Sequence, residues 1–315
     1  MTPRASRCCI HAVLIALAVP TLLPFVFALN NSVRSTAEMY HGYFGMPQAL
    51  REMAYCGWHA LTGAEGTVRI VTDTKQMLTL SYAGACGWHA RAITKNYVQA
   101  WTLLRPFVLN TVWVVIWVAL GVLLSGSVAA FVLARFSFPG KRVVFFYFIS
   151  TMMFPGVLTL VPSFLLVKQL GLLNSYSALI FPMIAGGQVF AIFVCKSFFD
   201  GLPQDLFDSA KIDGAGFFNL YWHLVLPLSQ PVLAVVLIMN VLGTWNSFLW
   251  PFIVNTDTKY HVIASGLYVL SVSESASNMG VLFAAYMLAS VPLLLLFAFA
   301  TKPFMQGMTS GAFKA

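Results

Sequence analysis

The most informative feature of this sequence is how little charge it carries. Only 9% of its 315 residues are charged, whereas 59% are hydrophobic. A soluble domain of this length would contain close to a quarter charged residues. The chain also has several uncharged apolar runs longer than the ~18 residues that mark a membrane-spanning helix. The composition therefore excludes an ordinary soluble protein and predicts a helical protein that crosses a membrane several times.

Two kinds of energy-coupling site are also missing. No G-x-x-x-x-G-K-[ST] phosphate loop occurs, and Gly140-Lys141-Arg142 lacks both the earlier glycine and the hydroxyl residue. If ATP drives this protein, another chain must bind it. Every Asp, Glu, Lys and Arg falls in or beside a predicted loop, whereas ion-coupled carriers usually mark their pathway with such residues inside the spans. A self-sufficient secondary transporter is thus disfavoured, although coordination by uncharged oxygens stays open.

The residues needed for enzymatic or metal chemistry are equally sparse. The five cysteines have no metal-binding spacing, and no serine has histidine and carboxylate neighbours within a span. His59 and His89 could bind a metal, but two histidines in a loop usually do not. The net charge of +8 is scattered, without a basic stripe. We expect no enzymatic activity, no metal or other cofactor, and no nucleic-acid partner.

Six apolar runs set the predicted fold class, an all-α polytopic membrane protein with six transmembrane helices. The first run follows Arg4 and Arg7 and lacks a good cleavage site, which favours a retained span over a signal peptide. The spans are expected at about 8–29, 107–134, 143–167, 172–195, 224–253 and 280–301.

Lysine and arginine in the short loops predict the orientation. Arg135, Lys141 and Arg142 follow the second span, and Lys196 and Lys211 follow the fourth. Six spans place these loops and both termini on one face, and the positive-inside rule makes that face the cytoplasm. The polar segment 30–105 is then extracytoplasmic.

Segment 30–105 contains a duplicated Cys-Gly-Trp-His-Ala unit, which begins at Cys56 and again at Cys86. Polar and apolar residues alternate over Thr67–Val71, which predicts a strand or hairpin. Cys56 and Cys86 are the only cysteines in this segment, and disulfides persist in oxidising compartments outside the cytosol. We therefore expect a disulfide between them, with two free thiols as the alternative.

A polar island between residues 202 and 231 interrupts the apolar runs. Pro203 suits the first turn of a helix, Asp205 suits its positive end, and Gly214 can end it in a left-handed conformation. A second short helix is predicted from the helical spacing of Phe218, Tyr221, Trp222 and Val225.

The island also carries a family resemblance. Asp208-Ser209-Ala210, Asp213-Gly214-Ala215 and Leu226-Pro227 resemble the Glu-Ala-Ala loop of ABC importer permeases, with Asp208 in place of Glu and Ser209 in place of the first Ala. Three further stretches are similar to the carbohydrate-uptake branch, of the maltose and glycerol-3-phosphate type, and to its second permease subunit: Ala134–Lys141, Thr244–Pro251 and Gln306–Lys314. The resemblance covers the first span and about 95–315, and residues 49–92 look like an insertion.

The resemblance implies a function and a set of partners. The island, between spans 4 and 5, would form cytoplasmic coupling helices at about 203–225 that dock on an ATPase subunit. The partners would be a homologous second permease, two ABC ATPase subunits and an extracytoplasmic solute-binding protein, in the cell inner membrane. Transport of a sugar or related polyol would proceed by alternating access, and a permease for a non-carbohydrate solute is the alternative.

The resemblance also implies how the chain is divided into segments. Together with the polar residues inside the predicted spans, it suggests a substrate pathway. An N-terminal tail and span (1–29), an extracytoplasmic loop (30–105) and a permease core with five spans (106–315) are expected. Amides inside a span need partners, so Asn240, Asn246 and Gln188 either line the substrate pathway or bond between helices. Trp245 lines the pathway or belongs to an interfacial aromatic belt.

Overall fold

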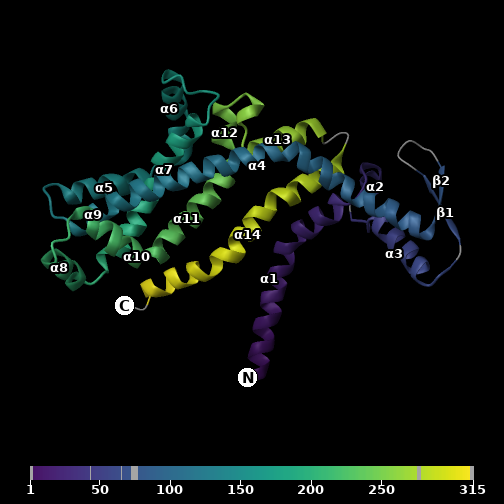
Figure 1. Ribbon diagram of the computed structural model, residues 1–315, viewed down its shortest axis with the longest axis horizontal. Helices are drawn as coiled ribbons and strands as arrows, with labels where there is room; N and C mark the ends of the chain where they lie inside the picture. The colour runs from purple at the N-terminus through teal and green to yellow at the C-terminus, as the bar shows by residue number, and fades with distance from the viewer. Residues whose placement is uncertain (1–2, 43, 65, 72–76, 275–277, 313–315) are drawn as a thin grey trace. The chain divides into compact units, whose positions relative to one another are not determined.

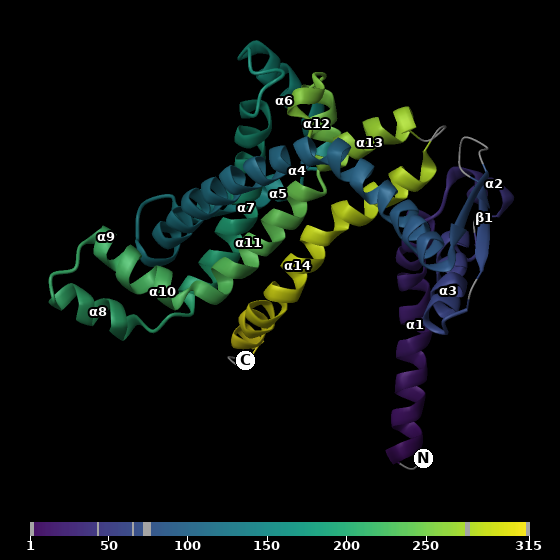
Figure 2. The same ribbon diagram turned by 45° about the vertical axis from the view of Figure 1, so that its right-hand side comes forward.

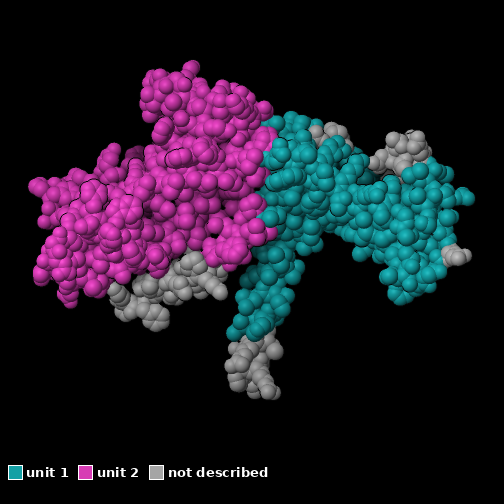
Figure 3. All heavy atoms as spheres, viewed as in Figure 1, with its two compact units in different colours: residues 1–105, 267–291 teal, residues 106–266, 292–315 magenta. Residues whose placement is uncertain are grey.

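The computed structural model describes residues 3–42, 44–64, 66–71, 77–274 and 278–312, with side chains for all of these except 3–9, 41, 71, 274 and 301–312. The described chain is helical apart from turns and one two-stranded hairpin (Figure 1). It divides into two compact units, coloured separately in Figure 3. Unit 1 comprises residues 1–105 and 267–291, and unit 2 comprises residues 106–266 and 292–315.

Unit 1 contains the first long helix and the polar segment that follows it. Its elements are α1 (Pro3–Ser32), α2 (Thr36–His41), α3 (Gln48–Leu61), β1 (Thr67–Val71), β2 (Met77–Ser81), the first part of α4 (Tyr82–Arg135), part of α13 (Ile263–Glu274) and the start of α14 (Met279–Ala312). The two strands pair antiparallel, with Thr67 opposite Ser81, which confirms the predicted hairpin. Ile70 of the hairpin packs with Cys56 and Ala85 in a small buried core.

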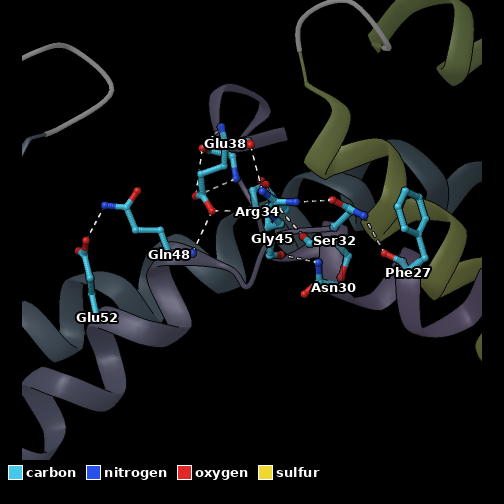
Figure 4. Close-up of polar contacts among 11 residues, drawn as sticks. Phe27, Asn30, Ser32, Arg34, Glu38, Gly45, Gln48 and Glu52 are labelled. Carbon is cyan, nitrogen blue, oxygen red and sulfur yellow. Dashed lines mark hydrogen bonds and ion pairs between the residues drawn. The ribbon is translucent and has the colours of Figure 1, made fainter. Parts of the chain in front are cut away.

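A network of hydrogen bonds holds the C-terminal end of α1 in place within unit 1. Arg34 is only 4% exposed, and it donates hydrogen bonds to Asn31 Oδ1 (3.1 Å) and to the Glu38 carbonyl (3.0 Å) (Figure 4). Asn96 of α4 donates to the carbonyls of Ser32 (2.9 Å) and Arg34 (3.1 Å). Because a buried charge is costly unless it is hydrogen-bonded, these contacts hold the α1–α2 connection against α4.

Unit 2 contains the polar island and most of the remaining apolar helices. Its elements are the second part of α4, α5 (Lys141–Met152), α6 (Gly156–Gln169), α7 (Ser177–Asp200), α8 (Gln204–Ile212), α9 (Phe217–Asn219), the π-helical turn η1 (Leu220–Val225), α10 (Leu226–Leu228), α11 (Gln230–Trp245), α12 (Leu249–Val254), the 3₁₀ turn η2 (Thr258–Tyr260), the start of α13 and the end of α14. Within this unit α8 and α9 lie together, away from α6 and α12, in both views (Figures 1 and 2).

Glycines allow α4 and α7 to approach closely. A Cβ atom at Gly121 would lie 2.3 Å from the Ile184 side chain, and one at Gly126 would lie 2.6 Å from the Ala191 Cβ. Close packing of this kind is a main source of helix association in a membrane. Lipid tails are as apolar as the side chains, so burying an apolar side chain between helices gives little hydrophobic stabilisation. Gly186 of α7, by contrast, has open surroundings.

Four helices in the described chain are long and apolar enough to cross a membrane: Ile10–Ser32, α4, α7 and Met279–Ala300. The number reaches six if each of two bent helix pairs counts as one span. These pairs are α5 with α6, bent by 100°, and Phe217–Leu228 with α11, bent by 78°.

Several helix boundaries differ from those predicted, and two of the differences have a clear physical cause. The expected third span breaks before Gly156, because Pro155 cannot continue the α5 hydrogen bonding. The expected fifth span ends at Trp245, and residues 249–254 form the separate helix α12. Helix α4 begins at Tyr82 rather than near Phe107, because its polar first part buries Ala100 against Val281 and Ala284 of α14.

Candidate functional site

Helix α8 forms as the polar island predicts. Pro203 occupies the N-cap, Asp205 lies in the first turn, and Lys211 lies in the last turn. Gly214 has φ +83° and donates its N–H to the Lys211 carbonyl at 3.0 Å, and Ala215 donates to the Ala210 carbonyl at 2.9 Å. The left-handed glycine therefore ends the helix, which confirms that prediction and makes residue 214 intolerant of branched side chains.

The motif residues of the island separate into an exposed and a packed set. Asp208, Ser209, Asp213 and Gly214 are exposed, as is Pro227. The half-buried residues Ala210, Ala215 and Leu226 pack against the main hydrophobic core of unit 2. The polar motif residues are thus presented outward on a helix whose other side is held by the core.

Arg135, the last residue of α4, is the main polar anchor of α8. Its Nη1 donates to Gln204 Oε1 (3.0 Å), and its Nη2 donates to the carbonyls of Leu202 (2.7 Å) and Phe199. The guanidinium also stacks over the Phe207 ring, 4.0 Å from its centroid. Gln204 in turn donates to Asp208 Oδ1 at 2.9 Å, so the hydrogen bonds run from α4 to the acidic motif residue.

The second short helix of the island is anchored to the same end of α4. It runs from α9 through the π-helical turn η1, so the predicted second helix is confirmed, although Leu220–Val225 is π-helical rather than α-helical. Phe131 is fully buried and contacts the rings of Phe217 and Tyr221, with centroids 5.2 and 5.7 Å away. The Ser127 and Tyr221 hydroxyls lie 2.6 Å apart. Both short helices are therefore fixed to one stretch of α4, residues 127–135.

Large apolar side chains remain exposed around the motif. Ile212 is 87% exposed and Phe218 is 71% exposed, although neither belongs to the quoted motif. Apolar side chains surrounded by polar residues are typical of a protein–protein contact surface. We name the surface formed by the exposed motif residues, Ile212 and Phe218 the docking face.

A second feature of unit 2 is a cavity of about 330 Å³ among its apolar helices. Ten residues line it: Val122, Met183, Gly187, Phe190, Val236, Met239, Asn240, Gly243, Thr244 and Ser247. The lining is apolar on most sides, with one amide and two hydroxyl groups. Asn240 Oδ1 is buried and has no hydrogen-bond partner among the described residues.

The four residues predicted to line the substrate pathway do not lie together in the structure. Only Asn240 lines the cavity, and Gln188 is the neighbour of the lining residue Gly187. Asn246 is exposed and donates its amide to the Leu242 carbonyl of its own helix at 2.9 Å, whereas Trp245 is buried. Thr244 and Ser247 belong to the family-like stretch Thr244–Pro251, but their place in the cavity lining was not predicted, because isolated hydroxyl residues in a span carry no periodic signal.

The two cysteines of the insertion lie in the same small core of unit 1. Cys56 is buried and Cys86 is half-buried, and both are free thiols in this structure. The Cys86 sulfur lies 3.9 Å from the position that a Cβ on Gly57 would take. Burial, and secondarily the charge of Glu52 and the neighbouring Cys86, raise the pKa of Cys56 above its ordinary value.

The described residues offer no group of three or more metal-ligating side chains. His59 stacks on Tyr82, and the Nε2 atom of His89 lies 3.0 Å from a Glu52 carboxylate oxygen. In the predicted C-terminal motif Gln306–Lys314, residues 313 and 314 lie outside the described residues, and only the helical backbone of 306–312 is described.

Comparison with known proteins shows the family. Residues 107–309 match the family described as "Binding-protein-dependent transport system inner membrane component". The diacetylchitobiose uptake permease NgcG of Streptomyces coelicolor is 31% identical over 96% of this chain and 88% of its own length. The arabinooligosaccharide permease AraQ of Halalkalibacterium halodurans is 33% identical over 65% of this chain and 72% of its own. The sn-glycerol-3-phosphate permease UgpE of Yersinia pestis is 28% identical over 70% and 76%.

A solved structure shows the same fold. A chain of a bacterial ABC transporter, described as importing the acidic polysaccharide alginate, superposes with a TM-score of 0.66 at 19% identity, covering 96% of this chain and 98% of its own. The family consists of membrane transport components rather than enzymes, and such importers work with ATPase and solute-binding partners. This chain therefore belongs to the binding-protein-dependent inner membrane permeases of ABC importers.

Proposed function

We propose that this permease translocates a sugar or a related polyol across the inner membrane. Relatives covering most of the chain are permeases for diacetylchitobiose, arabinooligosaccharides and sn-glycerol-3-phosphate, which supports this solute class. The complex would contain this chain, a homologous second permease, two ABC ATPase subunits and an extracytoplasmic binding protein.

The docking face couples transport to ATP hydrolysis in this proposal. Asp208, Ser209, Asp213, Gly214 and Pro227 would contact the ATPase subunit, and Ala210, Ala215 and Leu226 would hold the short helices in position. The observation that carries the proposal is the anchoring of α8 by Arg135, because displacement of α8 must pull on the end of α4. Closure of the ATPase dimer would thereby favour the outward-open state of the spans, a coupling that requires two discrete states.

The proposed topology has six spans, with the two bent helix pairs counted as spans three and five. Both termini and α8 face the cytoplasm, as the distribution of lysine and arginine in short loops supports. Residues 1–29 then form the N-terminal tail and first span, 30–105 the extracytoplasmic loop, and 106–315 the permease core. The proposed disulfide between Cys56 and Cys86 would lie in this extracytoplasmic loop.

The substrate pathway is proposed to pass Gln188, Asn240, Trp245 and Asn246. The cavity beside Asn240 supports this assignment at one of the four positions, because it is lined by uncharged polar groups within an apolar surround. No covalent chemistry is required of these residues.

Uptake of labelled saccharides by the complete importer in proteoliposomes tests the proposed function. We expect uptake to require both ATP inside the vesicles and the binding protein outside, and to be insensitive to ionophores that collapse ion gradients. Uptake driven by an ion gradient without ATP would instead support a secondary transporter.

A further inference from the structure

The cavity beside Asn240 has a chemistry that narrows the substrate class. It lies between α4, which contributes Val122, α7, which contributes Gly187 and Phe190, and α11, which contributes Asn240. Its volume of about 330 Å³ is at the lower end of the range for small-molecule sites and suits one ring-sized unit. The inference drawn from it rests on the proposed transport function.

Asn240 is the group in the cavity that most needs a ligand. Its Oδ1 atom is buried without a hydrogen-bond partner among the described residues. A buried polar atom left unpaired costs roughly 1–3 kcal/mol, which a ligand hydroxyl would recover once the amide turns its oxygen toward the cavity. Thr244 and Ser247 add hydroxyl groups to the same lining, and Phe190 adds an aromatic ring. A sugar ring presents both hydroxyl groups and C–H surfaces. The amide, hydroxyl and aromatic groups of the cavity lining are therefore suited to contact a sugar ring.

The cavity offers nothing to neutralise an anion. None of its ten lining residues is charged. The cations at the far ends of α4 and α7 already have partners, because Arg135 holds α8 and Lys196 pairs with Asp200 at 2.6 Å. Lys196 is also nine residues beyond Gly187, on the order of 14 Å along the helix. Burying a phosphate or carboxylate here without a paired cation would be strongly unfavourable.

Gly187 sets the shape of this cavity. A Cβ atom at residue 187 would lie 2.8 Å from Asn240 Nδ2 and 2.8 Å from Val122 Cγ2, so even alanine would push the amide aside. The adjacent Gly186 has nothing within 4 Å of its Cβ position. The two neighbouring glycines therefore provide a matched pair, in which only one substitution disturbs the amide.

We propose that this cavity is a binding subsite for one uncharged sugar unit, in which Asn240 bonds a ring hydroxyl and Gly187 keeps the amide in place. The subsite favours neutral saccharides over uronates and sugar or polyol phosphates. It lies entirely within this chain, and it determines specificity independently of the docking face.

The test measures initial uptake rates by the complete importer in proteoliposomes, with neutral oligosaccharides, uronate oligosaccharides and glycerol 3-phosphate as labelled probes. The variants are Asn240→Leu, Gly187→Ala and the control Gly186→Ala. We expect the wild type to import a neutral saccharide, and Asn240→Leu to raise its apparent KM about tenfold, the loss of one buried hydrogen bond. Gly187→Ala should raise it by a similar factor. Gly186→Ala should match the wild type in both apparent KM and basal ATP hydrolysis, and the rates of all variants are expressed per assembled complex.

Preferred import of a uronate or phosphorylated probe would overturn the subsite while leaving the proposed function standing. Unchanged KM for a neutral saccharide in both Asn240→Leu and Gly187→Ala would do the same. ATP-driven import of a solute other than a saccharide or polyol, with none of the probes transported, would overturn the subsite and the proposed function together.

Discussion

The guanidinium of Arg135 stacks over the ring of Phe207, with its carbon 4.0 Å from the ring centroid. Phe207 is the buried residue of α8, and Arg135 is the last residue of α4. The same guanidinium donates to two main-chain carbonyls, of Phe199 and Leu202, at the connection between α7 and α8. One side chain thus joins three helices at the place where force from an ATPase subunit would enter the permease.

Arg135 should be required for coupling rather than for insertion into the membrane. Arg135→Ala removes the stacking contact and all three hydrogen bonds, and we expect it to reduce substrate-stimulated ATP hydrolysis by about tenfold. Arg135→Lys keeps the charge but not the planar fork of donors, so it should recover only part of the stimulation. The measurement is ATP hydrolysis by the reconstituted complex with and without substrate-loaded binding protein.

Arg142→Ala is the matched control, because Arg142 is exposed and its guanidinium lies 5.7 Å from the Phe146 ring centroid, outside the contacts of α8. The complex with Arg142→Ala should show the same substrate stimulation of ATP hydrolysis as the wild type. Equal losses in Arg135→Ala and Arg142→Ala would show that general loss of positive charge, not the anchoring of α8, is responsible.

The topology can be tested at two sites of nearly equal exposure. Leu61 is 88% exposed at the end of α3, and Ile212 is 87% exposed at the end of α8. With the five native cysteines replaced by alanine, a membrane-impermeant thiol reagent should label Leu61→Cys in intact cells and Ile212→Cys only after permeabilisation. When the permease is expressed without its ATPase subunits, the equal exposure removes accessibility as an explanation, so the reverse pattern would overturn both the orientation and the docking role.

Cys56 and Cys86 should be bridged in protein kept from reductant. They share one small core, and a loop of about thirty residues closed by a disulfide gains roughly 3 kcal/mol in the chain-entropy model. Mass mapping without reduction should find the linked peptides, with Cys195 of α7 as a free-thiol reference. Alkylation of both Cys56 and Cys86 to the same extent as Cys195 in denatured, unreduced protein would rule the bridge out.

The parts of the molecule that could be predicted from sequence are those governed by local chemistry. Gly214 ends α8 because few residues tolerate its φ of +83°, and the alternation over Thr67–Val71 becomes β1 because one face of the hairpin is buried. Both signals lie within a few residues of the structure they specify.

The parts that could not be predicted depend on partners distant in the chain. The polar sequence at the start of α4 predicts a loop, because nothing local shows that Ala100 packs against Val281 of α14. Likewise, Arg135 has the sequence context of any cytoplasmic cation, and its role depends on the contact with Phe207 of α8. The cavity depends most strongly on residues that are distant in the chain. Its lining is drawn from three helices and the residue Ser247, and only Asn240 was distinctive enough to be identified in advance.

The central claim, that α8 transmits ATP-driven motion to the spans, is tested most directly at Gly214. Val at residue 214 would be forced into a left-handed conformation, whereas Val at Gly216, with φ −76° and open surroundings, would not. We expect Gly214→Val to abolish most substrate-stimulated ATP hydrolysis per assembled complex, and Gly216→Val to retain it. Equal stimulation in the two variants would contradict the account.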